Sequence, residues 1–200
     1  MMKNFEFWFD FGSPSAYLAW TQVPALEAAT GAIAIYKPML LGGVFQATGN
    51  HSPVTIAAKG KYTFVDFARY AKRYSVPLNL NPHFPINTLL LMRGAIGLQM
   101  TGDARFEKYC STVFKAIWID SLNLNDPATV GKTLQQAGFN VDELLAIAND
   151  QTTKDALKAA TQTAVERGIF GAPTFFVGNE MFWGQDRLDF VIEALQNAKS

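Results

Sequence analysis

Ser13 stands at the corner where an apolar segment passes into a helical one, in the run Gly12-Ser13-Pro14. The first N–H groups of a helix have no partner inside it and lie at the positive end of its dipole, so they favour a nearby anion. A serine hydroxyl at such a corner can help to hold a thiolate. It can equally act as a helix cap alone, with its oxygen accepting from the Ala16 N–H. The local sequence leaves both roles open.

Other catalytic chemistries fit the chain poorly. Residues 12–16 do not form the G-x-S-x-G elbow of a serine hydrolase, and the two histidines, His51 and His83, lie in a different segment. Cys110 is the only cysteine, so the C-x-x-C pair of disulfide exchange is absent and a structural zinc cluster lacks ligands. Its place in the middle of a predicted helix indicates a core position. We expect no redox cysteine and no metal.

A proline precedes a predicted strand near the C-terminus, in Gly171-Ala172-Pro173-Thr174. Inside a sheet, a trans proline would remove a ladder hydrogen bond, and a cis bond between Ala172 and Pro173 would explain its position. An ordinary trans proline at the start of the strand is the alternative, because cis X-Pro bonds are uncommon. The sequence alone does not decide between them.

A second C-terminal turn, Gly184-Gln185-Asp186, ends a strand and begins a helix. The amides of Gln185 and Asp186 then point outward and can bind a carboxylate, while the Asp186 side chain can accept from an ammonium group. A zwitterion would suit this turn. The alternative is that Asp186 is only a favourable acid in the first turn of the helix, with Arg187 solvated.

The elements that position these residues begin with an alternating segment. Four phenylalanines share one face of a predicted strand over residues 5–11, while Glu6, Trp8 and Asp10 share the other. A helix over 17–30 follows, with Pro24 expected to kink or restart it and Gly31 to stop it. A strand over 33–37 then completes a crossover that favours parallel pairing.

The middle of the chain, from Leu40 to about Asn149, contains no convincing strand. Strands return at 174–177 and 180–183, joined by the hairpin turn Gly178-Asn179, and an amphipathic helix closes the chain. The outer pieces must share one sheet, because neither has enough strands alone. We expect helices at about 60–74, 86–100, 103–119, 126–137 and 141–149, and a further helix over 150–167 that Gly168 ends.

Composition excludes several classes of protein. Seventeen basic and seventeen acidic residues give a net charge of zero, which removes the long-range attraction that non-specific nucleic-acid binding needs. Lys3, Glu6 and Asp10 interrupt any N-terminal secretory leader, and the apolar runs are far shorter than the roughly 20 residues of a membrane span. With a single cysteine, the chain fits a reducing cytosol. We expect a cytoplasmic protein without nucleic-acid or membrane partners.

Five motifs in order match a known pattern over Phe5 to about Leu195. They resemble the 2-hydroxychromene-2-carboxylate isomerase family, which is related to kappa-class glutathione transferases and disulfide-bond protein A. The resemblance implies an α/β, thioredoxin-like fold from residues 1–40 and 150–200, a large all-helical insertion domain over 41–149 between the βαβ and ββα halves, and a homodimer. The motifs are FDFGSPSAYLA at 9–19, Gly49-Asn50 with Pro53, HFPINT at 83–88, GAPTFFV at 171–177 and WGQDRL at 183–188.

The resemblance also implies roles for individual residues. Ser13 would replace the redox cysteine of the disulfide-exchange relatives and donate to the sulfur of the cofactor glutathione. Ala172, before a cis Pro173, would pair through its backbone with the cysteinyl part. Asn87 would line the cleft for a small aromatic substrate. The remaining glutathione-binding residues would be Gly184, Gln185 and Asp186 around the γ-glutamyl end, and Asn50 from the insertion.

The implied reaction is a cis–trans isomerisation. The glutathione thiolate adds to an unsaturated aryl pyruvate, the new single bond rotates, and glutathione leaves, which is nucleophilic catalysis with a borrowed nucleophile. Gln46 stands where several relatives carry a lysine, so the partner of a substrate carboxylate stays open, with His51 and Lys61 as candidates. Two other functions remain: a kappa-like transferase that conjugates or reduces electrophiles, and a non-catalytic thioredoxin-like module that binds extended peptides beside Pro173.

Overall fold

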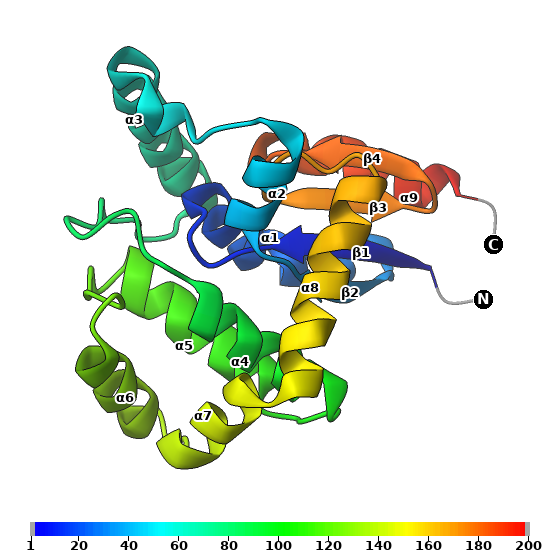
Figure 1. Ribbon diagram of the computed structural model, residues 1–200. Coiled ribbons are helices and arrows are strands. Elements are labelled where there is room, and N and C mark those ends of the chain that lie inside the picture. The colour runs from blue at the N-terminus through cyan, green and yellow to red at the C-terminus, as the bar shows by residue number, and fades with distance from the viewer. Residues whose placement is uncertain (1–2, 199–200) are drawn as a thin grey trace.

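Four short strands form one mixed sheet in the order β2-β1-β3-β4 (Figure 1). In this computed structural model, which describes residues 3–198, β1 (Asn4–Phe9) pairs in parallel with β2 (Ile33–Pro38). On its other side β1 pairs antiparallel with β3 (Thr174–Val177), which forms a hairpin with β4 (Glu180–Trp183). The two outer pieces of the chain therefore share a sheet, as predicted.

Aromatic side chains fill the face of β1 that carries the phenylalanines. Phe5, Phe7 and Phe9 are fully buried, and the rings of Phe7 and Phe175 stack with their centroids 5.0 Å apart. Large aromatic side chains bury much apolar surface each, so they tie the N-terminal strand to the C-terminal one. The strand ends at Phe9, earlier than predicted, because the side chain of Asp10 turns to bind other segments.

Helix α1 (Pro14–Thr30) follows directly. Pro14 occupies its first turn, where the missing N–H costs nothing, and Gly31 ends it with a left-handed φ of 67°. Of the two effects predicted for Pro24, the restart was wrong, since α1 runs uninterrupted through it, and the kink stays a prediction. A proline removes only one intrahelical bond there, and the buried residues on both sides, such as Leu18 and Leu26, hold the helix in place.

Helices alone are assigned over residues 41–149. The sequence missed one of them, α2, because Gly42 and Gly43 lie in its first turn and glycine disfavours helix. In Figure 1, α3 stands out at one end of the molecule, and α4 to α7 gather beside the sheet. These helices are α2 (Leu41–Thr48), α3 (Ala57–Tyr74), α4 (Leu89–Met100), α5 (Phe106–Trp118), α6 (Pro127–Gln136) and α7 (Val141–Asn149), with a 3₁₀ turn at Pro53–Thr55.

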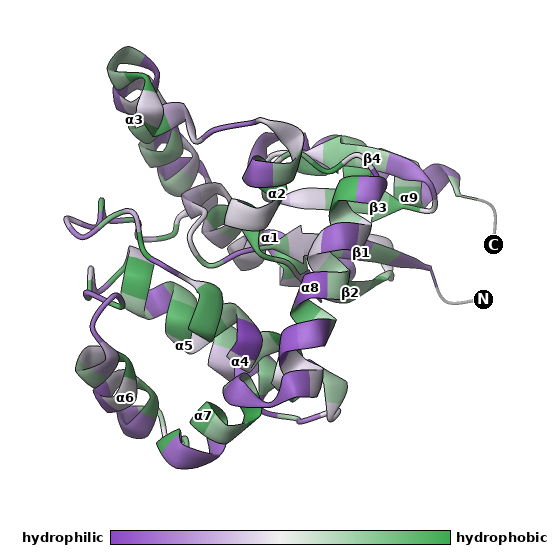
Figure 2. Ribbon diagram, viewed as in Figure 1, coloured by the Kyte–Doolittle hydropathy of each residue, from purple (hydrophilic) through white to green (hydrophobic). Residues whose placement is uncertain are grey.

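Helix α8 (Gln151–Glu166) carries the chain back to the sheet and packs against α2 and α4. It is amphipathic, with hydrophilic stretches visible in Figure 2 and with Leu157 and Ala164 buried. The chain ends in α9 (Leu188–Asn197). Within residues 3–198, no helix is long and apolar enough to cross a membrane.

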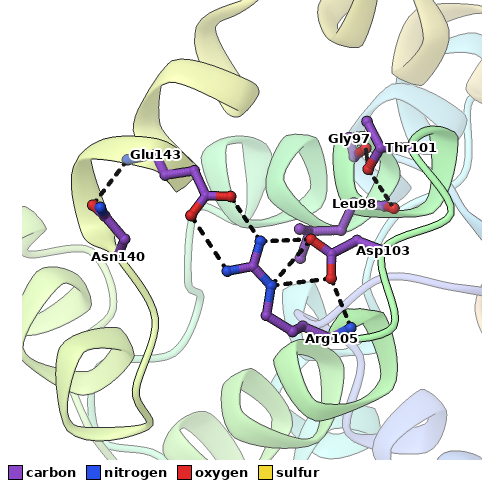
Figure 3. Close-up of polar contacts among 7 residues, drawn as sticks. All are labelled: Gly97, Leu98, Thr101, Asp103, Arg105, Asn140 and Glu143. Atoms are coloured by element: carbon purple, nitrogen blue, oxygen red, sulfur yellow. Dashed lines mark hydrogen bonds and ion pairs between the residues drawn. The ribbon is translucent and has the colours of Figure 1, made fainter.

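An ion-pair network ties the start of α5 to α7 (Figure 3). The Arg105 Nη2 atom lies 2.6 Å from Asp103 Oδ2 and 2.7 Å from Glu143 Oε1. The Asn140 side chain caps α7 by accepting from the Glu143 N–H at 3.2 Å, and Thr101 donates to the Leu98 carbonyl oxygen at the end of α4. The guanidinium group thus links the loop before α5 to the first turn of α7.

Candidate functional site

The Ser13 hydroxyl joins two segments that are 159 residues apart in the sequence. Its Oγ donates to the Ala172 carbonyl oxygen at 2.8 Å and accepts from the Ala16 N–H at 3.1 Å, so Ser13 is indeed the N-cap of α1. Ser13 and Ala172 are both buried, and the peptide bond between Ala172 and Pro173 is cis. The strand-to-helix corner and the turn before β3 therefore form one site.

The turn after β4 faces the same corner through its backbone. Gly184 adopts a φ of 103°, which favours glycine, and its N–H donates to the Pro173 carbonyl oxygen at 3.1 Å. Helical structure begins at Gln185, as predicted, first as a 3₁₀ helix over residues 185–187 and then as α9 from Leu188. The turn after β4 therefore lies next to Pro173.

Gln185 is held from two sides by residues that the sequence analysis did not single out. Its side-chain oxygen accepts from the Ser15 hydroxyl of α1, and its backbone oxygen accepts from the Tyr74 hydroxyl of α3 at 2.5 Å. Because the Gln185 side chain is buried, it points into the protein and positions the turn. Neither contact has a signal in the sequence, since both join elements far apart in the chain.

Asp186 is the partly exposed acid of this turn. Its carboxylate forms an ion pair with the neighbouring Arg187, whose side chain is about half exposed. The pair places one negative and one positive group side by side next to Gly184. Such an arrangement suits a zwitterionic ligand, because each charge can take a partner of the opposite sign.

Asn50 approaches the site from the loop after α2. Its Nδ2 donates to the Phe170 carbonyl oxygen at 2.8 Å, two residues before Ala172, and its Oδ1 accepts from the His51 N–H at 2.8 Å. The exposed Gly49 ends α2 with a φ of 69° and so directs the chain toward Phe170. The structure therefore brings Asn50 next to the segment that carries Ala172.

Asn87 is connected to the Ser13 corner through its neighbour Thr88, which contacts Asp10. The Asn87 side chain is exposed and accepts from the Leu89 N–H at 3.2 Å, while its own N–H donates to Asn125 Oδ1 at 2.8 Å. The buried Thr88 hydroxyl donates to Asp10 Oδ1 at 2.7 Å, just before the Ser13 corner. Asp10 and Asn125 are two further residues of the site that the sequence analysis missed.

Burial shows which aromatic and sulfur-bearing side chains could meet a ligand. Trp118 is fully buried and donates its Nε1–H to the Phe11 carbonyl oxygen at 2.8 Å, and Trp8 is buried as well, so neither faces a ligand. Phe45 on α2 is partly exposed. Cys110 is fully buried in α5, where desolvation raises the pKa of its thiol well above the ordinary value. The prediction that Cys110 belongs to the core is confirmed.

A cavity between β4 and α9 lies away from these residues. It has a volume of about 530 Å³ and is lined by residues such as Glu180, Phe182 and Phe190. It contains none of the predicted site residues. Among residues 3–198, no cluster of three or more histidine, cysteine or acidic side chains could hold a metal ion. The polar groups that converge are those around Ser13.

Comparisons with known proteins show the family and the fold of the chain. The DSBA-like thioredoxin domain family matches residues 5–196. The 2-hydroxychromene-2-carboxylate isomerase of Sphingobium xenophagum is 31% identical over 193 residues, covering 96% of this chain and 97% of the relative. A solved structure of 2-hydroxychromene-2-carboxylate isomerase superposes with a TM-score of 0.84 at 28% identity, covering 96% and 94%. Glutathione S-transferase kappa 1 of Rattus norvegicus is 22% identical, covering 93% and 88%.

Proposed function

Because this chain belongs to the DSBA-like thioredoxin domain family and to the 2-hydroxychromene-2-carboxylate isomerases within it, we propose that it is a glutathione-dependent cis–trans isomerase. The observation that carries the proposal is the Ser13 hydroxyl, which lies at the N-terminus of α1 and 2.8 Å from the Ala172 carbonyl oxygen. A hydroxyl donor stands where disulfide-exchange relatives would need a cysteine. The chain therefore supports thiolate chemistry without a thiol of its own.

The residues around Ser13 fit the thiol of glutathione. A serine hydroxyl has one hydrogen, and in the structure that hydrogen goes to the Ala172 carbonyl oxygen. Rotation about the Ser13 side-chain bond would redirect it to a sulfur bound at the corner, where the N-terminus of α1 also favours negative charge. Each unit by which the thiol pKa falls corresponds to about 1.4 kcal/mol.

The other predicted contacts fit the remaining parts of the tripeptide. The backbone of Ala172, beside Pro173, would pair with the cysteinyl residue, and Asn50 would hold the peptide from the side of α2. Asp186 would accept from the γ-glutamyl ammonium group while Arg187 meets its carboxylate. The inward side chain of Gln185 acts by fixing the turn at Gly184 rather than by direct contact.

Bound glutathione would supply a thiolate that adds to the unsaturated side chain of an aryl pyruvate and leaves after the bond has rotated. Ser13 would hold the sulfur as the anion, both for the attack and for its departure. Asn87 would lie along the aromatic substrate. The carboxylate of the substrate would be met by His51 or Lys61, which are both exposed on the α2 and α3 side.

A kappa-like glutathione transferase is the second candidate, favoured by the similarity to the rat enzyme over most of the chain. It would use the same contacts, and only the fate of the electrophile differs. An isomerase returns glutathione unchanged, whereas a transferase that conjugates or reduces its substrate consumes it stoichiometrically. Quantifying glutathione after many turnovers therefore separates the two.

The test combines calorimetry with spectroscopy. Glutathione is titrated into the wild type, Ser13→Ala and the control Ser111→Ala, which alters an exposed serine on α5. Thiolate absorbance is then followed across pH. We expect wild type and Ser111→Ala to bind glutathione with a lowered thiol pKa, and Ser13→Ala to raise that pKa and slow isomerisation of hydroxychromene carboxylate by about 100-fold. Absence of binding to the wild type would instead favour the peptide-binding module.

A further inference from the structure

Asp10 is a buried carboxylate that accepts hydrogen bonds from three separate segments. Its Oδ1 accepts from the Gly12 N–H at 2.8 Å and from the Thr88 hydroxyl at 2.7 Å, and its Oδ2 accepts from the Leu41 N–H at 2.8 Å. Only 2% of Asp10 is exposed. A buried carboxylate surrounded by donors is the arrangement that keeps such a group satisfied without a cation.

The three donors come from three different segments of the proposed site. Gly12 precedes Ser13, and Leu41 is the first residue of α2, which ends next to Asn50. Thr88 follows Asn87 and precedes α4. A Cβ built on Gly12 would lie 3.4 Å from both Asp10 Oδ1 and Thr88 Cγ2, so the carboxylate sits directly against the turn before Ser13.

These contacts, with the chain segments between them, form a closed ring that includes the Ser13 hydroxyl. The ring runs from Asp10 to Leu41, through α2 to Asn50, from Asn50 to the Phe170 carbonyl oxygen, and from Ala172 to Ser13. Thr88 joins this ring from the side of the substrate segment. A shift of Asp10 would therefore move the glutathione wall and the substrate wall together.

We propose that Asp10 is a positioning residue that couples the glutathione-binding wall, formed by α2 and Asn50, to the substrate wall at Asn87 and Thr88. The kinetic test of this inference rests on the proposed function, whereas its test by hydrogen exchange does not. Asp10 touches neither ligand and acts through Leu41 and Thr88.

The ionised form of Asp10 is the one that its surroundings fit. Burial raises the pKa of Asp10, and the hydrogen bonds from Gly12, Thr88 and Leu41 act against that rise. Two of the three partners are backbone N–H groups, which can only donate. An amide in place of the carboxylate would point its NH₂ group at one of these N–H groups in either orientation.

Three substitutions separate the contacts. Asp10→Asn leaves one backbone donor unsatisfied, with the Leu41 N–H as the expected loss because Oδ1 serves two donors and Oδ2 only one. Thr88→Val removes the hydroxyl at nearly constant shape. Thr161→Val tests the glutathione wall independently of Asp10, because Thr161 Oγ1 accepts from the Leu40 N–H at 3.0 Å, one residue before α2.

The experiment measures the glutathione Kd by calorimetry and the KM for hydroxychromene carboxylate at saturating glutathione. We expect Asp10→Asn to raise both constants about tenfold, since an orphaned buried donor costs roughly that factor. Thr161→Val should raise mainly the glutathione Kd, and Thr88→Val mainly the substrate KM. Equal effects of all three variants on both constants, or a loss of thermal stability with unchanged constants, would overturn the coupling.

Amide hydrogen exchange in the ligand-free protein provides the readout that needs no ligand. In Asp10→Asn, the amides of Leu41 and of residues 87–89 should exchange faster, while those of α9 keep their protection. If the wild type fails to bind glutathione, the proposed function is lost, and this exchange pattern alone decides whether Asp10 joins the walls. Unchanged exchange at Leu41 and 87–89 would refute the proposal. If Asp10→Asn does not fold, Thr88→Val decides, because it removes one contact of Asp10. Faster exchange at Leu41 as well as at residues 87–89 would support the coupling, and faster exchange at residues 87–89 alone would refute it.

Discussion

The Ser13 hydroxyl donates to the Ala172 carbonyl oxygen at 2.8 Å, so one hydrogen bond joins the start of α1 to the turn before β3. A sulfur that enters this corner competes with the carbonyl oxygen for the hydroxyl hydrogen of Ser13. A thiolate accepts more strongly than a neutral carbonyl, because charge-assisted hydrogen bonds are about twice as strong. The corner therefore favours the anionic form of a bound thiol, and this property can be measured without glutathione.

Ser13→Cys places a thiol directly at the corner. We expect its pKa to fall about one unit or more below the ordinary value near 8.5, because the N-terminus of α1 stabilises the thiolate. Absorbance of the thiolate across pH measures this value.

The native Cys110 does not contribute to this absorbance near neutral pH, since burial in α5 raises the pKa of its thiol. Ser111→Cys, an exposed position on α5, serves as the control with an ordinary pKa. A pKa at Ser13→Cys equal to that of the control would show that the corner does not stabilise anions.

Tyr74→Phe removes the hydroxyl that donates to the Gln185 carbonyl oxygen. Burial, together with Tyr70 and Asp186, raises the pKa of Tyr74 to about 12, so the hydroxyl keeps its hydrogen at neutral pH. We expect the variant to lose about 1 kcal/mol of stability and to bind glutathione several-fold more weakly, because the turn at Gly184 loosens. Denaturant melts and calorimetry measure the two effects.

Tyr70→Phe is the matched control for Tyr74→Phe. Tyr70 lies one turn earlier on α3, and its ring centroid is 5.7 Å from that of Tyr74. Within residues 3–198 its hydroxyl makes no hydrogen bond. We expect the control to keep the wild-type glutathione Kd. If both variants weaken binding equally, the effect comes from the aromatic pair and not from the bond to Gln185.

Local signals in the sequence predicted most of the framework. The alternation from Phe5 to Phe9 requires only neighbouring residues, and so does the hairpin at Gly178, which adopts a φ of 60°. Gly31 and Gly168 stop helices for the same local reason, since their positive φ values favour glycine. Such features depend on only a few neighbouring residues, so a single sequence is enough to predict them.

The unpredicted features depend on contacts between distant segments. Helix α2 forms in spite of Gly42 and Gly43, because Asp10 and Thr161 accept from the N–H groups at its start. The bond from Tyr74 to Gln185 spans 111 residues. Ser13 was found because its cap position is local, whereas its acceptor at Ala172 follows only from the fold.

Asn50→Ala tests the contact between the loop after α2 and the Phe170 carbonyl oxygen. Its control is Asn149→Ala, because Asn149 on α7 also donates one side-chain hydrogen bond, to the Leu145 carbonyl oxygen at 2.9 Å. Each variant should lose about 1 kcal/mol of stability or less. Only Asn50→Ala should raise the glutathione Kd, by several-fold. Equal Kd values for the two variants and the wild type would remove Asn50 from the site.

Arg105→Met tests the network of Figure 3 through its dependence on pH. Hydrogen bonds from Arg105 lower the pKa of Asp103 and of Glu143 below their ordinary values of 3.8 and 4.5. A carboxyl group with a lower pKa in the folded state contributes stability that is fully present above its unfolded pKa and is lost as the pH falls through its folded pKa. We therefore expect the wild type to be more stable than the variant near neutral pH, and the difference to shrink well below pH 3.8.

Added salt should shrink this difference in stability as well, since Arg105 and Glu143 are exposed and screened. Denaturation midpoints of both proteins across pH and salt measure this difference in stability. A difference that does not depend on pH would mean that Arg105 acts through its packing and not through its charge.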